Sequence, residues 1–263
     1  MIDFKRKDRY GYDDLVQIIH LLRSPGGCPW DQEQTHQSIR RNFLEETYEV
    51  LEAIDEDDPV HMCEELGDVL TQVVFHGDME QDAGRFTLED IYDGVCKKMI
   101  LRHPHIFGDV QVDGSEEVLV NWEAIKRVEK GQETYTDTLR AVAKNLPATW
   151  RAEKLQKKAA KAGFAWPDAQ SAADKLAEEA VELQQALRSG EDPSEELGDV
   201  LFAAVSVAFQ ARSDPEDMLQ AACEKFIRRF SRMEQLAEGR QLDQLPRDEL
   251  LHLWDRAKQS REV

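Results

Sequence analysis

The six-residue sequence Glu-Leu-Gly-Asp-Val-Leu occurs twice in this chain, at residues 65–70 and again 131 positions later at residues 196–201. Each copy follows a segment with the pattern Glu-Glu-x-x-Glu, which begins at Glu45 in the first half and at Glu178 in the second. Carboxylates at such spacing lie on one face of a helix, and two neighbouring helices of this kind can present oxygen ligands to a hard divalent cation. The repeat therefore predicts two similar helical halves, each with a candidate metal site.

Further residues repeat in the same order along the chain. The first-half members are Lys98, Arg102, Trp122 and Lys126, and their second-half counterparts are Lys225, Arg229, Trp254 and Lys258. A preserved order at nearly constant separation favours duplication of one helical domain over chance matches. We therefore predict an N-terminal domain at residues 1–130, a polar linker at 131–145, and a C-terminal domain at 146–263.

The fold class follows from the spacing of apolar residues. They recur at helical intervals in a sequence rich in Glu, Leu, Ala, Gln and Lys, and alternating strand patterns are nearly absent. We predict an all-α protein of two tandem helical-bundle domains. Helices are expected near residues 12–22, 34–55, 60–81, 88–102 and 116–129 in the first half, and near 147–162, 169–189, 194–211, 215–236 and 247–260 in the second.

The net charge of the chain limits the classes of ligand that it is expected to bind. The chain has 33 Lys and Arg against 53 Asp and Glu, a net charge of −20, so we expect neither nucleic acid nor an anionic membrane to bind it. A small phosphorylated ligand is compatible, because a bound cation and a few basic residues reverse the local field. The scattered cysteines, the lack of an apolar leader and the lack of a membrane-spanning run predict a cytoplasmic protein.

The second acidic cluster lies beside an apolar stretch. Glu196 and Asp199 border the apolar face of their helix on a helical wheel, and residues 200–209 are apolar except for Ser206. We therefore expect much of this helix to be buried and Asp199 to be partly desolvated. Converging buried carboxylates repel one another, and a bound cation relieves that cost.

The ligand type narrows the expected metal. Sites made of carboxylates alone favour Mg²⁺ or Mn²⁺ over zinc. A di-iron site is an alternative that would use Glu-x-x-His segments, and the chain contains two, at residues 33–36 and 249–252. Neither belongs to the repeated acidic clusters, which favours the magnesium interpretation.

The basic pairs suggest the ligand. Lys225 and Arg229 lie one helical turn apart, a pattern that taken alone is typical of ordinary ion pairing on a solvated face. Their duplication beside a duplicated acidic cluster changes the interpretation. Cations, a metal and the aromatic ring of Trp254 together suit a nucleoside polyphosphate, which requires charge neutralisation along its phosphates and stacking for its base.

These motifs together resemble the MazG family of nucleoside triphosphate pyrophosphohydrolases. The segments that carry the resemblance include CPWDQEQTH, EETYEV, EELGDVL, RHPHIFGDV, NWEAIK, LPATWRAEKLQKKAAKAGFAW, EEAVEL, EKFIRRF and LWDRAK. The resemblance covers nearly the whole chain and implies hydrolysis of an NTP or dNTP to a nucleoside monophosphate and pyrophosphate, by helical domains that form the active site in a homodimer. A nucleotide-sensing or dimerisation module without hydrolysis, and a dUTP or phosphoribosyl-ATP pyrophosphohydrolase, are the alternatives.

The resemblance also implies roles for individual residues. It places Mg²⁺ ligands at Glu179, Glu182, Glu196 and Asp199, with Glu46, Glu49, Glu65 and Asp68 as their first-half equivalents. It places nucleotide contacts at Lys175, Glu178, Glu179, Lys225, Arg229, Trp254 and Lys258. We expect Glu178, or a metal-bound hydroxide that it assists, to act as the base. The other expected catalytic residues are Glu179, Glu182, Glu196 and Asp199. The first half has Asn42 at the position of Lys175, which favours the second half as the catalytic one.

Overall fold

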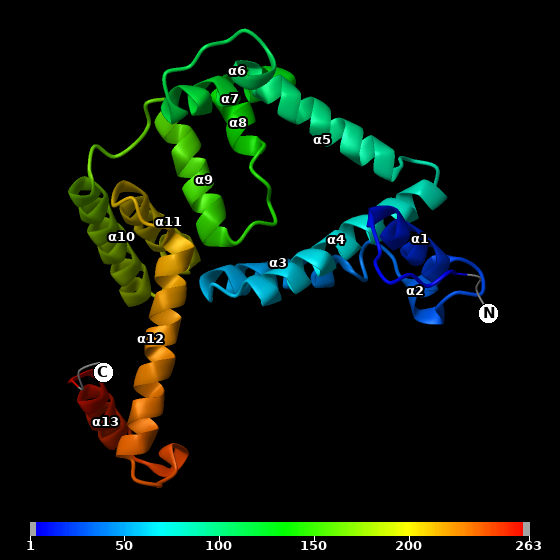
Figure 1. Ribbon diagram of the computed structural model, residues 1–263. Helices are drawn as coiled ribbons and strands as arrows, with labels where there is room; N and C mark the ends of the chain where they lie inside the picture. The colour runs from blue at the N-terminus through cyan, green and yellow to red at the C-terminus, as the bar shows by residue number, and fades with distance from the viewer. Residues whose placement is uncertain (1–3, 260–263) are drawn as a thin grey trace. The chain divides into compact units, whose positions relative to one another are not determined.

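The computed structural model describes residues 4–259, and within that range it is built of helices without strands (Figure 1). Two compact units divide the chain, Met1–Lys126 and Arg127–Val263. The all-α prediction is confirmed. The predicted domain limits stay a prediction, and their first three and last four residues lie outside the described part. None of the described helices combines the length and the apolar content of a membrane span.

The first unit is organised around a helical hairpin. Its helices are α1 (Tyr12–Arg23), α2 (Pro29–Glu33), α3 (Arg40–Asp55), α4 (Pro59–Asp82), α5 (Leu88–Arg102), α6 (Pro104–Phe107) and most of α7 (Ser115–Glu129). The hairpin of α3 and α4 turns at Asp58, whose side chain accepts hydrogen bonds from the backbone N–H groups of Val60 and His61. Pro59 takes the first helical position, where no N–H partner is needed.

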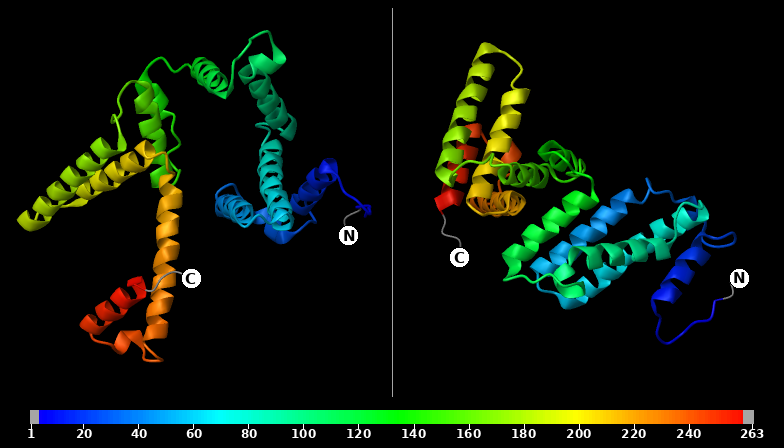
Figure 2. Two further views of the ribbon diagram at one scale, coloured as in Figure 1. Left: turned by 60° about the vertical axis from the view of Figure 1, so that its left-hand side comes forward. Right: turned by 90° about the horizontal axis from the view of Figure 1, so that it is seen from above.

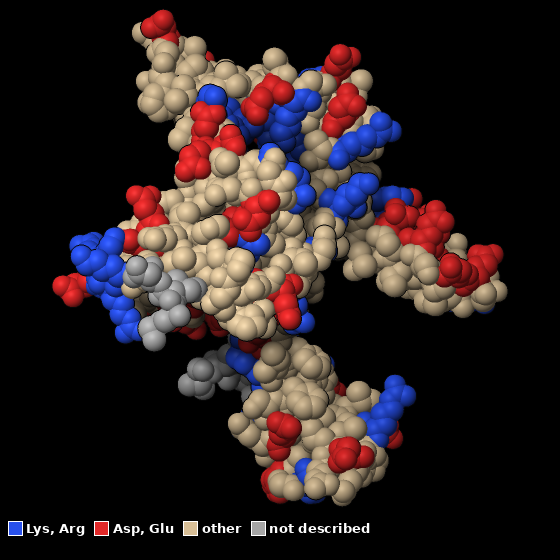
Figure 3. Space-filling view, turned by 90° about the vertical axis from the view of Figure 1, so that its right-hand side faces the viewer, with Lys and Arg blue, Asp and Glu red and all other residues tan. Residues whose placement is uncertain are grey.

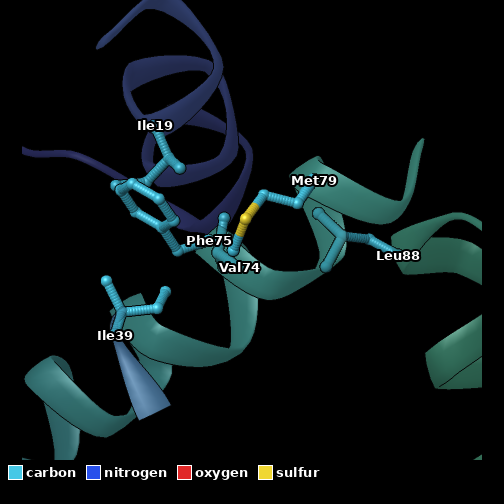
Figure 4. Packing of buried hydrophobic residues seen from close by; sticks show 6 residues of the cluster. All are labelled: Ile19, Ile39, Val74, Phe75, Met79 and Leu88. Carbon is cyan, nitrogen blue, oxygen red and sulfur yellow. The ribbon is translucent and has the colours of Figure 1, made fainter. Parts of the chain in front are cut away.

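The core of this unit lies between α1 and α4. Its buried members are Ile19, Ile39, Val74, Phe75, Met79 and Leu88. Figure 4 shows the ring of Phe75 between Ile19 of α1 and Ile39, which immediately precedes α3. Phe75 is only 6% exposed, so it fills the space between these elements.

The second unit is also organised around a helical hairpin. Its helices are α8 (Tyr135–Arg140), α9 (Ala148–Lys161), α10 (Ala169–Ser189), α11 (Ser194–Gln210), α12 (Pro215–Leu236), the 3₁₀ helix η1 (Leu242–Gln244) and α13 (Arg247–Gln259). Helices α10 and α11 lie side by side in both views of Figure 2. Gly190 ends α10 with a φ of 76°, a left-handed conformation that glycine adopts without steric cost. A small apolar cluster, which includes Met233 and Leu253, joins α12 to α13.

The described helices differ from the expected ones at several places. A continuous helix from residue 34 was wrong, because Thr35 and Ser38 exchange hydrogen bonds between side chains and backbone N–H groups and form a turn before α3. The segment 131–145 was predicted as linker, yet Thr134 and Asp137 form a capping box that starts α8 there. The break predicted after residue 103 contains the short helix α6.

Candidate metal and nucleotide site

The facing sides of α10 and α11 bring three carboxylates together. Glu179 and Glu182 come from α10 and Glu196 from α11, and each offers an oxygen within 4.8 Å of the other two. We refer to these three residues as the α10–α11 cluster. Its α3–α4 counterpart consists of Glu46, Glu49 and Glu65 under the same distance limit. Both halves therefore bring carboxylates from two neighbouring helices close together, and their role as metal ligands stays a prediction.

A lysine adjoins the α10–α11 cluster. Lys175, one turn before Glu179, places its Nζ atom 2.8 Å from Glu179 Oε1 and 2.7 Å from Glu178 Oε1. The hydrogen bond that Lys175 donates to Glu179 lowers the pKa of Glu179, although burial of the carboxylate acts in the opposite direction. Burial raises the pKa of Glu182, and the neighbouring Glu179 raises it further. The cluster therefore combines an ionised carboxylate with one that holds a proton more readily.

The α3–α4 cluster has no such lysine, since Asn42 takes the equivalent position. Burial raises the pKa of Glu46, and the charges of Asp68, Glu49 and Glu65 raise it further. The pKa of Glu65 is raised by burial and then by Glu49. The two clusters thus share a geometry but differ in their internal charge compensation.

The carboxylates in both clusters suit a hard divalent cation. Every offered ligand atom is a carboxylate oxygen, the donor type that Mg²⁺ and Mn²⁺ prefer. In the first unit Glu65 Oε2 is buried without a hydrogen-bond partner, while its Oε1 lies 3.2 Å from His61 Nε2. An unpartnered buried carboxylate oxygen is costly, and a bound cation would satisfy it.

The two aspartates of the repeat stand apart from these groups. Asp68 and Asp199 are both exposed, and neither belongs to the sets of oxygens that meet within 4.8 Å. The expectation that Asp199 is partly desolvated is wrong for the single chain. On a helical wheel Asp199 lies about 160° from Leu197 and Leu201. Those two side chains are uncovered as well, at 48% and 62% exposed, so α11 is open to solvent on more than one side.

Both hairpins leave apolar side chains uncovered around their carboxylates. In the second unit these are Val181, Leu187, Leu197, Leu201 and Phe202, and in the first unit Leu44, Tyr48, Leu51, Ile54, Leu66 and Leu70. The repeat pairs Leu66 with Leu197 and Leu70 with Leu201, so the same positions are uncovered twice. Figure 3 shows one face of the molecule, on which residues other than Lys, Arg, Asp and Glu cover wide areas between scattered acidic and basic side chains. Several exposed apolar side chains on two adjacent helices are a common feature of interaction sites.

The predicted nucleotide contacts on α12 and α13 have other described partners or none with the cluster. Lys225 and Arg229 form no described hydrogen bond or ion pair with the α10–α11 cluster, and Lys258 pairs with Asp255 at 2.7 Å. Trp254 packs against Phe226 with ring centroids 5.3 Å apart. Lys175 and Glu178 are the nucleotide-contact candidates that the structure brings next to the cluster.

The structure also contains a group that the sequence analysis missed. His20, Asp78 and Asp82 offer ligand atoms within 4.8 Å of one another, yet Arg23 pairs with both aspartates. The guanidinium thus supplies the positive charge that these carboxylates need. The only sequence signal was the Asp-x-x-x-Asp spacing on α4.

The residues proposed for a di-iron site have other partners. Glu249 pairs with Arg240, and His36 contacts His76 and Glu80. No described group of three metal-ligand atoms includes Glu249 or His36. The observed contacts therefore give the di-iron alternative no support.

Comparison with known proteins agrees with the repeat. Residues 34–107 and 168–233 match the MazG nucleotide pyrophosphohydrolase domain. The chain is 41% identical over 249 residues to the nucleoside triphosphate pyrophosphohydrolase/pyrophosphatase MazG of Thermotoga maritima, which covers 94% of this chain and 95% of that protein. It is 43% identical over 236 residues to the nucleoside triphosphate pyrophosphohydrolase of Escherichia coli K12, covering 88% and 90%. The uncharacterized protein YabN of Bacillus subtilis is 46% identical over 256 residues, 95% of this chain and 52% of that protein.

Proposed function

The chain belongs to the MazG family of nucleotide pyrophosphohydrolases, and on that premise we propose that its α10–α11 cluster is the catalytic site. The protein hydrolyses nucleoside triphosphates to nucleoside monophosphates and pyrophosphate. The contact of Lys175 with Glu178 and Glu179 is the observation that carries the assignment to the second unit. The α3–α4 cluster has Asn42 at the position of Lys175, and the basic side chain described beside it is His61, which contacts Glu65.

Mg²⁺ is the cofactor that we assign to this site, with Mn²⁺ as its substitute. Glu179, Glu182 and Glu196 would hold it, and Asp199 would complete the ligand set. When bound, the ion neutralises phosphate charge and polarises a water molecule. Glu46, Glu49, Glu65 and Asp68 are the corresponding ligands in the first unit.

The remaining steps belong to side chains of this chain. A water oxygen attacks the α phosphorus, the bond from that phosphorus to the bridging oxygen breaks, and pyrophosphate leaves. Glu178, which is exposed and held by Lys175, accepts the proton of the attacking water. Lys175, which contacts Glu178 and Glu179, would offset negative charge on the reacting phosphate.

A homodimer is the assembly that best explains the exposed apolar side chains on the hairpin of α10 and α11. Leu197 and Leu201 on α11 present an apolar strip next to the carboxylates, and a second copy of the hairpin would bury it in a four-helix arrangement. The same copy would bring Lys225, Arg229, Trp254 and Lys258 to the phosphates, which they do not reach within one chain. A cytoplasmic location stays a prediction.

Two charge-removing variants test the catalytic assignment. Glu179→Gln and Glu46→Gln are made separately in the full chain, and pyrophosphate release is measured with Mg²⁺ and a panel of nucleoside triphosphates. Glu179→Gln should remove most of the turnover, and Glu46→Gln should cost less. Glu191→Gln, at an exposed position in the turn after α10, controls for the loss of one negative charge.

The outcomes separate the alternatives. Undiminished pyrophosphate release by Glu179→Gln contradicts the assignment of the site. A larger loss in Glu46→Gln than in Glu179→Gln moves catalysis to the first unit. Unchanged helical circular dichroism and thermal midpoints show that neither variant acts through unfolding.

A further inference from the structure

Two histidine side chains meet in the first unit at a contact that the proposed site does not use. His36 lies in the turn before α3 and His76 lies on α4, and their Nδ1 atoms are 2.7 Å apart. The two rings are within 8° of parallel, and their centroids are 5.0 Å apart. At this centroid separation a 2.7 Å contact requires the rings to lie edge to edge in nearly one plane. The N–H group and the lone pair of an imidazole point in that plane, so the contact is a well-directed hydrogen bond.

This hydrogen bond allows only some protonation states of the pair. A neutral imidazole has one N–H group and one nitrogen that accepts, so one Nδ1 atom donates and the other accepts. One additional proton leaves the bond in place, because a charged ring can donate to a neutral one. Two additional protons do not, since both Nδ1 atoms then carry hydrogen and point it at each other. The pair therefore holds at most one positive charge while the contact persists.

A carboxylate beside the pair favours the first of these protons. Glu80 Oε1 lies 2.5 Å from His36 Nε2, which is ion-pair distance. The oxygen does not lie along the N–H direction, since Nε2 is buried without a hydrogen-bond partner among the described residues. Arg85 binds the same carboxylate through contacts of 2.5 and 2.7 Å, so Glu80 is held in its ionised form.

The described charge contacts on the helices that pack against α4 do not involve the histidine pair. On α1, His20 and Arg23 both contact Asp78. The charge contacts on α3 and α5 are those of Arg41 with Glu45, Lys97 with Asp93, and Asp90 with Thr87. The side chain of α3 that meets His76 is the uncharged Phe43, whose ring lies edge-on with a centroid separation of 5.8 Å.

The surroundings of His76 disfavour a second proton. Burial lowers the pKa of His76 from 6.5, the charge of His36 lowers it further, and the charge of Glu80 acts in the opposite direction. A histidine whose pKa is lower in the folded state stabilises the fold above its ordinary value, and that contribution is lost as the pH falls below about 6.5. Acidification should therefore weaken the contact between the two rings.

The pair joins the start of α3 to α4. His36 lies in the turn at residues 34–39, which ends at Ile39, a core residue that is only 4% exposed (Figure 4). Helix α3 follows this turn directly and carries Glu46 and Glu49, two carboxylates of the α3–α4 cluster. Separation of the two rings would therefore loosen the entry to a helix that carries candidate metal ligands.

The second unit has no equivalent of this pair. The repeat places Val207 at the position of His76. One position earlier, Phe75 fills the core of the first unit, whereas its equivalent Ser206 lines a cavity of about 470 Å³. A response that depends on His76 is therefore confined to the first unit.

We propose that His36 and His76 form a proton-sensitive latch in the first unit. The pair binds one proton with its contact intact, and a second proton separates the rings and frees the turn at residues 34–39 from α4. The latch acts on the entry to α3 while the other helices of the unit stay folded. It is independent of the catalytic role proposed for the α10–α11 cluster.

Hydrogen exchange in the full chain tests this latch. The protection factors of the backbone amides at residues 36–43 are measured from about pH 7.5 to about pH 5. Because the open state holds one proton more than the closed pair, protection should fall about tenfold per pH unit below about pH 6.5. The amides of α5 are the internal reference and should keep their protection over the same range.

Two variants remove the second proton. His76→Phe keeps an aromatic ring beside Phe43 but cannot be protonated, so the pH dependence of protection at residues 36–43 should disappear, whatever the level of protection. His36→Phe should have the same effect. His252→Gln, at an exposed position on α13, is the control and should leave the pH dependence unchanged.

Nitrogen NMR of the histidine side chains provides a measurement on the unaltered protein. One Nδ1 atom of the pair should carry hydrogen and the other should not, and the two rings should titrate in separate steps. Two rings that titrate independently near the ordinary pKa of histidine would overturn the latch, as would a pH dependence of protection that persists in both histidine variants. An equal loss of protection in α5 would show that the whole unit unfolds, which contradicts a local latch.

Discussion

Truncation of Leu201 on the outer side of α11 tests the proposed homodimer. Leu201 is 62% exposed in the single chain, and complete burial of a leucine side chain contributes about 2 kcal/mol. Burial of its exposed part in a dimer therefore contributes about 1.2 kcal/mol per copy, or about 2.4 kcal/mol for two copies related by symmetry. At 1.4 kcal/mol per tenfold, Leu201→Ala should raise the dimer dissociation constant roughly 50-fold.

The measurement is sedimentation velocity over a dilution series, with pyrophosphate release recorded on the same samples. Activity should fall with dilution at the concentration where the dimer dissociates, because the second copy supplies the basic residues of α12 and α13. Leu119→Ala in the first unit is the matched control, since Leu119 is 64% exposed and lies on α7. A wild-type protein that remains monomeric and fully active at all concentrations would refute the reasoning, as would an unchanged dissociation constant in Leu201→Ala.

Three further predictions concern stability and charge. Leu253 is 2% exposed and lies between α12 and α13. Leu253→Ala should therefore lower the free energy of unfolding by about 2–5 kcal/mol, measured by urea titration. A loss below about 1 kcal/mol would contradict the place of Leu253 in the core. Lys175→Asn should raise the pKa of Glu179, measured by carboxyl-carbon NMR without divalent cations; an unchanged pKa would show that the Lys175 contact does not form in solution. The hydrogen bond and charge of Arg85, followed by the contact with His36, lower the pKa of Glu80 from about 4.5 to about 2. These contacts stabilise the fold above pH 4.5, and their contribution is lost as the pH falls towards 2. Arg85→Ala should therefore reduce the pH dependence of unfolding in that window, and an unaltered dependence would count against the pair.

The pattern of residues along the chain was sufficient to predict much of the fold. The bounds of α10 and α12 agree with the predicted ranges, because each has an Asp at its N-cap and a clear helical period. The turn at Thr35 and Ser38 was missed because its hydrogen bonds are local and compete with a helix that the composition also favours.

The proposed metal ligands were partly predictable from the sequence, because carboxylate spacing along a helix is a local property. Carboxylates three residues apart lie on one face of their own helix, which the spacing predicts. Only the packing of α10 against α11 decides that Glu179, Glu182 and Glu196 meet while Asp199 does not. The exposure of Asp199 did not follow, because burial depends on which other elements cover a helix. The sequence shows that α11 is apolar, but it does not say whether this chain or a second copy covers it.

The sequence by itself determined that this protein is helical, duplicated and equipped with two sets of paired carboxylates. Only the tertiary structure decided how the two halves differ. Lys175 compensates a carboxylate in the second unit, and Phe75 fills a space that stays open around Ser206. The physical reason is that helical period and ligand spacing are properties of neighbours along one chain, whereas a cavity depends on the volumes of side chains that several elements bring together.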